Sequence, residues 1–213
     1  MFMLRVSEIF YSLQGETTRM GLPTVFVRLT GCPLRCVYCD TQYAFTGGKV
    51  MSIPEILDEV ANRRTYYVTV TGGEPLAQKG CLPLLSALCD AHYSVSIETS
   101  GAFDITKIDR RVSRIVDIKT PGSGEVSKNL FENLTVISSS DEIKFVLCNR
   151  EDYQWALEII TNYRLTEVCP ILFSPAYGQL EANSLAEWIL KDHAPVRLQL
   201  QLHKILWGEV AGR

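Results

Sequence analysis

Three cysteines, Cys32, Cys36 and Cys39, are the residues whose type and spacing are best suited to chemistry. The spacing C-x3-C-x2-C places three sulfurs on one short loop, and a thiolate is a strong metal ligand. Three local thiolates suit a four-iron four-sulfur (4Fe-4S) cluster whose fourth iron stays open to a substrate or cofactor. A structural zinc ion needs a fourth ligand, and the next candidates, Cys81 and His92, lie far along the chain in a predicted amphipathic helix. A zinc site completed from afar, or a set of buried structural cysteines, is the alternative.

The cysteine content of the whole chain agrees with a metal-binding loop. The sequence holds seven cysteines, an odd number, and three of them fall within eight positions. This distribution favours a metal site in a reducing compartment over a disulfide framework. The other four lie in apolar patterns that predict burial in the core: Cys81, Cys89, Cys148 and Cys169.

A second group of polar residues follows the C-terminal ends of predicted strands. In the segment Thr71–Pro75, adjacent glycines let the backbone approach a ligand closely, and the Glu74 carboxylate can accept a hydrogen bond from an ammonium group. Parallel barrels build their active sites on the rim where the strands end. We therefore expect one rim to carry the candidate groups Arg28, Thr71, Gly72, Gly73, Glu74, Glu98, Thr99, Lys119, Ser174 and Pro175.

The strands that position these groups are short, rich in β-branched and aromatic residues, and bounded by Gly or Pro. The strong candidates are residues 24–29, 66–71, 94–99, 142–147 and 168–173, with weaker ones at 115–118 and 197–202. Between them lie helical patterns, the clearest at 52–62, where Ser52 and Glu55 form a capping box. Asn149 precedes another helix, whose polar positions include Glu151 and Asp152.

This alternation of strands and helices predicts an α/β fold with a mainly parallel sheet and helices outside. The chain of 213 residues falls short of the roughly 250 typical of a closed eightfold barrel, so an incomplete, TIM-like (β/α) barrel is the preferred architecture. A flat doubly wound sheet is the alternative. We expect one domain over residues 1–213, with Thr120–Gly124 as a flexible connector or, alternatively, a mobile lid.

Charge and hydropathy exclude several classes of partner. The 21 Lys and Arg residues nearly balance the 24 Asp and Glu residues, so there is no basic field to bind nucleic acid. The first residues lack the pattern of a signal peptide, and no run approaches the roughly 20 apolar residues that a membrane span needs. We expect a cytoplasmic protein without membrane association.

The cysteine loop resembles that of the radical S-adenosylmethionine (SAM) superfamily. Tyr38 matches the aromatic residue before the last cysteine, and Thr71–Pro75 matches the glycine-rich turn after the next strand. In that superfamily the open iron binds the amino and carboxylate groups of SAM, and reductive cleavage gives a 5′-deoxyadenosyl radical. The resemblance implies a 4Fe-4S cluster and SAM as cofactors, and an incomplete barrel of the radical SAM type.

A closer resemblance, to the 7-carboxy-7-deazaguanine synthases, runs nearly from end to end. It is carried by residues 9–16, 26–32, 39–41, 97–101 and 201–204. This resemblance implies a carbon–nitrogen lyase of queuosine biosynthesis that converts 6-carboxy-5,6,7,8-tetrahydropterin to 7-carboxy-7-deazaguanine. The radical would remove hydrogen from C6 of the pterin, the six-membered ring would contract, and ammonia would leave. The resemblance also suggests a homodimer, and we expect a flavodoxin or ferredoxin as the reductant.

The resemblance also assigns roles to individual residues. Cys32, Cys36 and Cys39 would hold the cluster, and Thr41 would bind Mg2+ as its single protein ligand, with Asp40 as a chemical competitor. The pterin site would comprise Leu13, Gln14, Gly15, Arg28 and Thr71, with the planar fork of Arg28 on the substrate carboxylate. The SAM site would comprise Tyr38, Cys39, Asp40, Gly73, Glu74, Asp117, Ile118, Lys119, Ser174, Pro175, Ala176 and Tyr177. We expect no catalytic side chain beyond the cluster-bound cofactor.

The sequence departs from that family at two places. Residues 117–119 stand where many relatives carry Ser-Pro-Lys, so Lys119 is the best-matched residue of the three. The run 205–209 is longer than in relatives whose terminal residue covers the substrate, which leaves that contact unassigned. Two rival functions stay open. One is a glycyl-radical activating enzyme, which would not need Leu13–Gly15 and Arg28 in their places, and the other is a noncatalytic iron–sulfur or zinc carrier.

Overall fold

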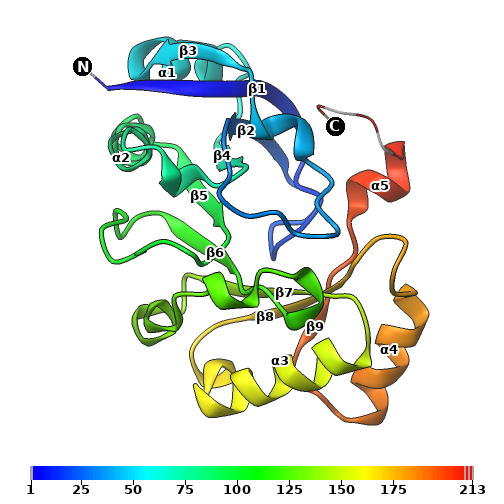
Figure 1. Ribbon diagram of the computed structural model, residues 1–213. Helices are drawn as coiled ribbons and strands as arrows, with labels where there is room; N and C mark the ends of the chain where they lie inside the picture. Colours follow the sequence, from blue (N-terminus) through cyan, green and yellow to red (C-terminus); the bar gives the residue numbers. More distant parts are fainter. Residues whose placement is uncertain (1, 209, 211, 213) are drawn as a thin grey trace.

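One curved sheet organises the chain in the computed structural model, which describes residues 2–208, 210 and 212. Its nine strands follow the order β3-β1-β2-β4-β5-β6-β7-β8-β9. In Figure 1 the sheet bends around a central space, and its edge strands β3 and β9 do not pair with each other. The incomplete barrel predicted from the sequence is confirmed, and the flat doubly wound alternative is wrong.

From β2 to β9 along the sheet order, each strand runs parallel to the next, so these strands end on the same rim. These strands are β2 (Pro23–Leu29), β4 (Tyr67–Gly72), β5 (Ser94–Thr99), β6 (Ser113–Asp117), β7 (Glu142–Leu147), β8 (Ile171–Pro175) and β9 (Arg197–Leu198). They coincide closely with the predicted runs, because strands covered on the outside by helices are apolar along most of their length. The ends differ most in three strands: β6 begins at Ser113 instead of 115, β8 spans Ile171–Pro175 instead of 168–173, and β9 stops at Leu198 instead of 202.

The first strand is an addition that the pattern did not predict. β1 (Met3–Leu13) pairs antiparallel with β2 and with the short β3 (Lys49–Ser52). Its buried residues Leu4 and Val6 alternate with exposed Met3 and Arg5, but the alternation fades in the second half of the strand. An outer strand with so few fully buried positions lacks the apolar run that marks the others.

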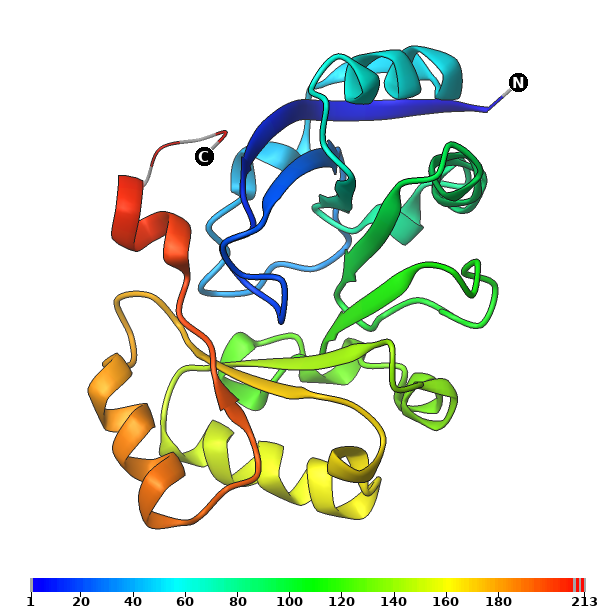
Figure 2. The same ribbon diagram turned by 180° about the vertical axis from the view of Figure 1, so that it is seen from behind.

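Four helices cover the outside of the sheet, as the two opposite views in Figures 1 and 2 show. They are α1 (Ile53–Ala61), α2 (Cys81–Asp90), α3 (Arg150–Asn162) and α4 (Ala182–Lys191), and the short α5 (Leu202–Trp207) follows β9. The predicted capping box of Ser52 and Glu55 begins α1, and the Asn149 side chain accepts a hydrogen bond from Asp152 N at the start of α3. These caps satisfy backbone N–H groups that a helix leaves unpaired at its first turn.

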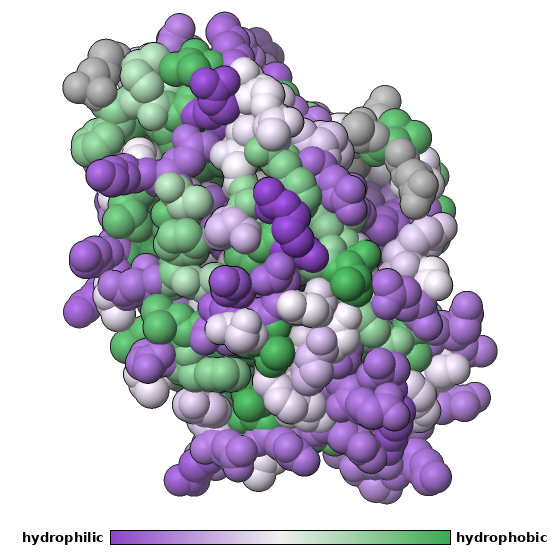
Figure 3. Space-filling model, in the orientation of Figure 1, coloured by the Kyte–Doolittle hydropathy of each residue, from purple (hydrophilic) through white to green (hydrophobic). Residues whose placement is uncertain are grey.

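The hydrophobic core lies between the helices and the sheet. Ile56 and Val60 of α1, Leu84 and Leu88 of α2, and Tyr153 of α3 belong to it and are fully buried. Hydrophilic side chains gather along the lower edge of the face in Figure 3, over α3 and α4, which are amphipathic. No helix of the described residues has the length and apolarity needed to cross a membrane.

The segment after β6 differs from its prediction. Where a flexible connector or lid was expected, Pro121–Ser123 form a 3-10 turn that ends at Gly124 with a φ of 77°. Glycine adopts this left-handed conformation at little cost. Thr120 and Ser123 are fully buried, so this segment is packed into the molecule.

Candidate active site

The rim where the parallel strands end surrounds a cavity of about 230 Å3. Its walls come from the loop after β2, from the ends of β4 to β8, and from the segment leading into α5. Most residues predicted for the site line it, namely Arg28, Cys32, Cys36, Tyr38, Cys39, Asp40, Thr41, Thr71, Gly73, Asp117, Lys119, Pro175, Ala176 and Tyr177. The chain thus brings residues from widely separated segments to one place.

The other predicted residues lie behind the walls: Leu13, Gln14, Gly15, Glu74, Ile118 and Ser174. Ile118 is fully buried in the hydrophobic core, whereas its neighbours Asp117 and Lys119 line the cavity. Successive side chains of an extended segment point to opposite sides, which explains the difference. Lys119 Nζ lies 2.8 Å from Asp117 Oδ2 and 5.8 Å from the centre of the Tyr38 ring.

The cysteine loop supplies three free thiols, each partly exposed and facing the cavity. Burial raises the pKa of Cys32 and raises that of Cys36 to about 11. No three His, Cys, Asp or Glu side chains in the described part of the chain meet around the position of one metal ion. Three separate sulfurs on one loop fit a cluster that leaves one iron without a protein ligand.

The glycine turn after β4 packs against the start of the cysteine loop. A Cβ added to Gly72 would lie 2.4 Å from Leu29 O, and one added to Gly73 would lie 2.4 Å from Gly31 O. Side chains are therefore excluded here by the protein's own backbone. Glu74 N donates to Gly31 O over 2.8 Å, which ties the turn to the loop.

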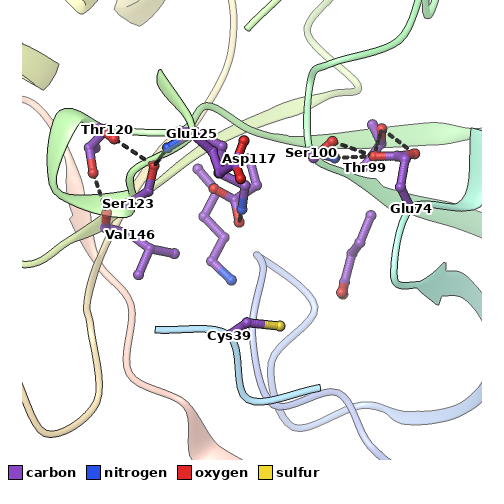
Figure 4. A network of polar contacts seen from close by, with 12 residues as sticks. Cys39, Glu74, Thr99, Ser100, Asp117, Thr120, Ser123, Glu125 and Val146 are labelled. Carbon is purple, nitrogen blue, oxygen red and sulfur yellow. Dashed lines mark hydrogen bonds and ion pairs between the residues drawn. The ribbon is translucent and has the colours of Figure 1, made fainter. Parts of the chain in front are cut away.

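The Glu74 carboxylate is fully buried and is satisfied by the protein itself. It accepts hydrogen bonds from the Thr99 hydroxyl at 2.9 Å, from Ser100 N at 2.7 Å and from Leu76 N at 2.9 Å. Figure 4 shows this network at the end of β5, beside the cavity. Through these hydrogen bonds Glu74 joins the ends of β4 and β5.

On the side opposite the cysteines, the loop between β1 and β2 crosses to β7. Glu16 forms an ion pair with Lys144, and each side chain is only 12% exposed. Burial alone raises the pKa of a carboxyl group, but the Lys144 charge and hydrogen bonds from Lys144 and Gln201 lower that of Glu16 to about 2. Thr18 N donates to Glu142 at 3.0 Å, which fastens the same loop to the start of β7.

Glu98 is a second carboxylate in the cavity, and it has no ion-pair partner among the described residues. Gln14 Nε2 lies 3.3 Å from its Oε1, and Thr71 Oγ1 donates to Oε2 over 3.2 Å. Burial raises the pKa of Glu98, and the neighbouring Glu16 charge adds to the rise. Gln14, although behind the wall, thus orients a group that faces the cavity.

Arg28 forms an ion pair at the edge of the cavity. Its Nε donates to Glu8 at 2.7 Å, and the Tyr43 hydroxyl donates to the same carboxylate oxygen at 2.9 Å. The residue nevertheless lines the cavity. The ion pair with Glu8 uses Nε and restrains the guanidinium plane at the cavity wall.

The segment before and within α5 closes the cavity from the C-terminal side. Leu202 N donates to Gly15 O over 2.9 Å, and a Cβ on Gly15 would lie 2.5 Å from His203 Nδ1. Lys204 Nζ lies 3.1 Å from Asp40 Oδ2, which joins this segment to the end of the cysteine loop. Burial lowers the pKa of His203, with Lys204 and Lys144 adding to the fall.

Sequence reasoning gave no individual role to several polar lining residues, among them Glu16, Lys144, Gln201 and His203. A signal was present for Lys144, because a lysine between Ile143 and Phe145 interrupts an otherwise apolar strand. A charge at such a position is costly unless it is paired. Its partner, Glu16, is 128 positions away, and nothing in the sequence around Glu16 indicates the pairing.

Comparisons with known protein families agree with this geometry. The model of the "Radical SAM superfamily" matches residues 26–166. The chain is 47% identical over 208 residues to the 7-carboxy-7-deazaguanine synthase of Chlorobaculum tepidum, with 96% of this chain and 94% of that relative covered. It is 41% identical over 219 residues to the 7-carboxy-7-deazaguanine synthase of Koribacter versatilis, with 96% and 97% covered.

Solved structures support the fold. The crystal structure of QueE from Escherichia coli matches with a TM-score of 0.78 at 23% identity and covers 94% of this chain and 95% of its own. Streptococcus suis SuiB bound to S-adenosylmethionine matches with a TM-score of 0.54 at 12% identity, over 80% of this chain and 44% of its own. At these identities the matches concern the arrangement of strands and helices.

Proposed function

The chain belongs to the 7-carboxy-7-deazaguanine synthase family of the radical SAM superfamily, and on this premise we propose how its own residues carry out the reaction. The reaction converts 6-carboxy-5,6,7,8-tetrahydropterin to 7-carboxy-7-deazaguanine with loss of ammonia. A 4Fe-4S cluster and SAM are the cofactors of the superfamily, and when bound they supply the radical that removes one hydrogen atom from the substrate. The observation that carries the proposal is the meeting of three free thiols and a buried charged wall in one cavity.

The cofactor half of the cavity is formed by the cysteine loop and its neighbours. Cys32, Cys36 and Cys39 hold the cluster, and the Gly72–Gly73 turn offers backbone groups to the amino acid part of SAM. The Asp117–Lys119 pair and residues 175–177 line the adjacent wall, where they contact the rest of the cofactor. These residues bind and orient, since positioning accounts for most of the protein's contribution in a cofactor reaction.

The pterin half is built for a heterocycle rich in N–H donors. Glu98 faces the cavity without an ion-pair partner among the described residues, so it can accept hydrogen bonds from the 2-amino and ring N–H groups of a pterin. Gln14 and Thr71 hold that carboxylate in place. The free edge of Arg28 faces the substrate carboxylate, to which a guanidinium can donate two hydrogen bonds. Glu16 and Lys144 neutralise each other and close the cavity to water.

We include Mg2+ in the proposal, bound by Thr41 with substrate oxygens and water. Thr41 lines the cavity, and its hydroxyl lies 3.7 Å from Cys39 Sγ, which places this position at the border of the two halves. Mg2+ keeps several waters and accepts few protein ligands. A flavodoxin or ferredoxin as reductant and a homodimeric assembly complete the proposal.

One experiment tests the assignment. The anaerobically reconstituted, reduced protein is incubated with SAM, Mg2+ and 6-carboxytetrahydropterin, and the products are identified by mass. We expect 7-carboxy-7-deazaguanine, with less product when Mg2+ is withheld. Cleavage of SAM without any deazaguanine would refute the substrate and leave the radical SAM chemistry intact.

A further inference from the structure

The segment Thr120–Glu125, here called the clasp, holds the cysteine loop from outside. Val37 N donates to Ser123 O at 3.1 Å, and Arg35 N donates to Glu125 Oε1 at 2.6 Å. Across the described residues, these are the only hydrogen bonds that connect positions 32–38 with a distant part of the chain. The backbone shape of the cysteine loop therefore depends on where the clasp lies.

The clasp is in turn fastened to α3 by Asp152. Gly122 N donates to Asp152 Oδ1 at 2.7 Å, and the Thr120 hydroxyl lies 3.0 Å from Asp152 Oδ2. Cys148 N donates to the same Oδ2 at 2.9 Å. Inside the clasp, Ser123 Oγ donates to Thr120 O and accepts from Glu125 N, which makes the segment one rigid unit, as Figure 4 shows.

The approach of the clasp to Asp152 is close enough to restrict the residue type. A Cβ added to Gly122 would lie 2.4 Å from Asp152 Oδ2 and 3.0 Å from Cys148 Cβ. Gly122 has no left-handed backbone, so this contact is the reason for a glycine at the position. Asp152 and Gly122 are therefore packed too closely to admit a larger residue at position 122.

The burial of Asp152 is unusual for its position. An aspartate in the first turn of a helix normally faces water, where it interacts favourably with the helix dipole. Asp152 is only 1% exposed, and burying a carboxylate is costly unless hydrogen bonds compensate. Two of the compensating donors, Thr120 and Gly122, belong to the clasp.

We propose that Asp152 is a positioning residue that acts through the clasp to hold the cysteine loop in the shape that receives the cluster. The path runs from Asp152 to Gly122 and Thr120, then through Ser123 and Glu125 to the amides of Val37 and Arg35. Because those two amides donate to protein oxygens, they do not donate to the cysteine sulfurs. Hydrogen bonds to sulfur are one determinant of the reduction potential of a cluster. The proposal rests on cluster binding by the loop and is independent of the pterin assignment.

The first test compares Asp152→Asn with Asp141→Asn. Asp141 is equally buried and accepts hydrogen bonds from Arg114 and Ser138, but it precedes β7 at the end of the barrel remote from the cysteines. In Asp152→Asn, one of the two carboxylate oxygens becomes an NH2 group. This group then faces the N–H of Gly122 or of Cys148, which had donated to the carboxylate. Loss of about one net hydrogen bond predicts about tenfold faster amide exchange of Val37 in the cluster-free protein, and a similar acceleration of iron loss to a chelator in the loaded protein. Asp141→Asn should lower the melting temperature without either change.

A second pair keeps the test valid if Asp152→Asn fails to fold. Glu125 is partly exposed, so Glu125→Ala removes the acceptor for Arg35 N with little effect on folding. We expect faster iron loss and an altered electron paramagnetic resonance spectrum of the reduced cluster, both restored in Glu125→Gln, whose amide oxygen still accepts. The proposal is overturned if Asp152→Asn matches Asp141→Asn, or if Glu125→Ala matches Glu125→Gln. Product formation by the unmodified protein is measured separately and decides the proposed function alone.

Discussion

The two walls of the cavity are built in opposite ways. The cysteine wall is one continuous loop of partly exposed thiols. Within the described residues, the long-range hydrogen bonds of its positions 32–38 go to the clasp, while Gly31 and Asp40 at its two ends contact Glu74 and Lys204. The pterin wall combines Glu16, Glu98 and Lys144 from three separate elements, with buried charges that pair or accept hydrogen bonds before any ligand arrives. The first wall is held in shape by the clasp and gains its reactive group only with a cofactor, whereas the second wall is complete within the fold.

This difference predicts two kinds of failure. Damage to the cysteine wall should stop radical formation and every later step, because the cluster is needed for all of them. Damage to the pterin wall should leave the cofactor half intact, so SAM cleavage should continue without productive turnover. Separate measurement of SAM cleavage and of deazaguanine formation tells the two walls apart.

The largest effect is expected for Cys36→Ala. A cubane held by two thiolates loses iron readily, so both SAM cleavage and product should fall below detection. Iron content per chain and the yield of 5′-deoxyadenosine after reduction give the measurement. Cys89→Ala is the matched control, since Cys89 is buried in α2 away from the cavity and should keep four irons. Normal cleavage by Cys36→Ala would contradict the assignment of the loop.

The next largest effect concerns Lys144→Met on the other wall. Removing one partner of a buried pair leaves Glu16 charged and unpaired, which costs roughly 3 to 5 kcal/mol of stability. We expect product formation to fall by about a hundredfold or more while SAM cleavage continues, because a shift of about 1 Å in a positioned substrate has that effect.

The double variant Glu16→Gln with Lys144→Met serves as the control for stability. It removes both charges, so the melting temperature should return towards that of the unmodified protein while product formation stays low. Recovery of product in the double variant would show that the pair acts through stability alone.

The same contrast explains how much of the molecule could be predicted from its sequence. The cysteine wall lies within a few positions of the chain, so spacing alone indicates its chemistry. The strand pattern likewise predicts β5 and β7 to the residue, because apolar runs mark them locally. The pterin wall is different, since Glu16 and Lys144 meet only after the loop between β1 and β2 has crossed the barrel. The burial of Asp152 could not be predicted either, because a residue in the first turn of a helix is normally exposed.

A third expectation concerns Glu98 and pH. The pKa of Glu98 in the folded protein lies above the ordinary value of 4.5. As pH rises from 4.5 through the folded-state pKa, ionisation of Glu98 therefore destabilises the folded state relative to the unfolded state. Glu98→Gln should therefore raise the melting temperature at neutral pH, and the gain should vanish below pH 4.5. The same change should raise the KM for the pterin about tenfold or more, through loss of charge-assisted hydrogen bonds.

A glutamate with the opposite pKa shift sharpens that measurement. Glu55→Gln, in the exposed capping box of α1, changes a carboxylate whose pKa is lowered by hydrogen bonds from Ser52. Glu55→Gln should lower the melting temperature above the ordinary pKa of 4.5, and this loss should disappear in acid. This pattern is the reverse of the one expected for Glu98→Gln. If Glu98→Gln is less stable than the unmodified protein at pH 7, its carboxylate is better satisfied than the structure indicates.

The smallest effect is expected where the two walls are joined, at the ion pair of Lys204 and Asp40. Asp40 is 41% exposed although Lys204 is only 9% exposed, and because water reaches one partner the pair contributes about 1 kcal/mol or less. Lys204→Gln should therefore raise the KM for the pterin about two- to threefold with kcat nearly unchanged, because the pair holds only the C-terminal cover of the cavity. Salt screens such pairs, so the unmodified protein should approach the variant as ionic strength rises. Lys191→Gln, on the exposed end of α4, should change neither value. A large loss of kcat in Lys204→Gln would instead show that Lys204 contacts the reacting groups. The ion pair with Asp40 would then not be the main role of Lys204.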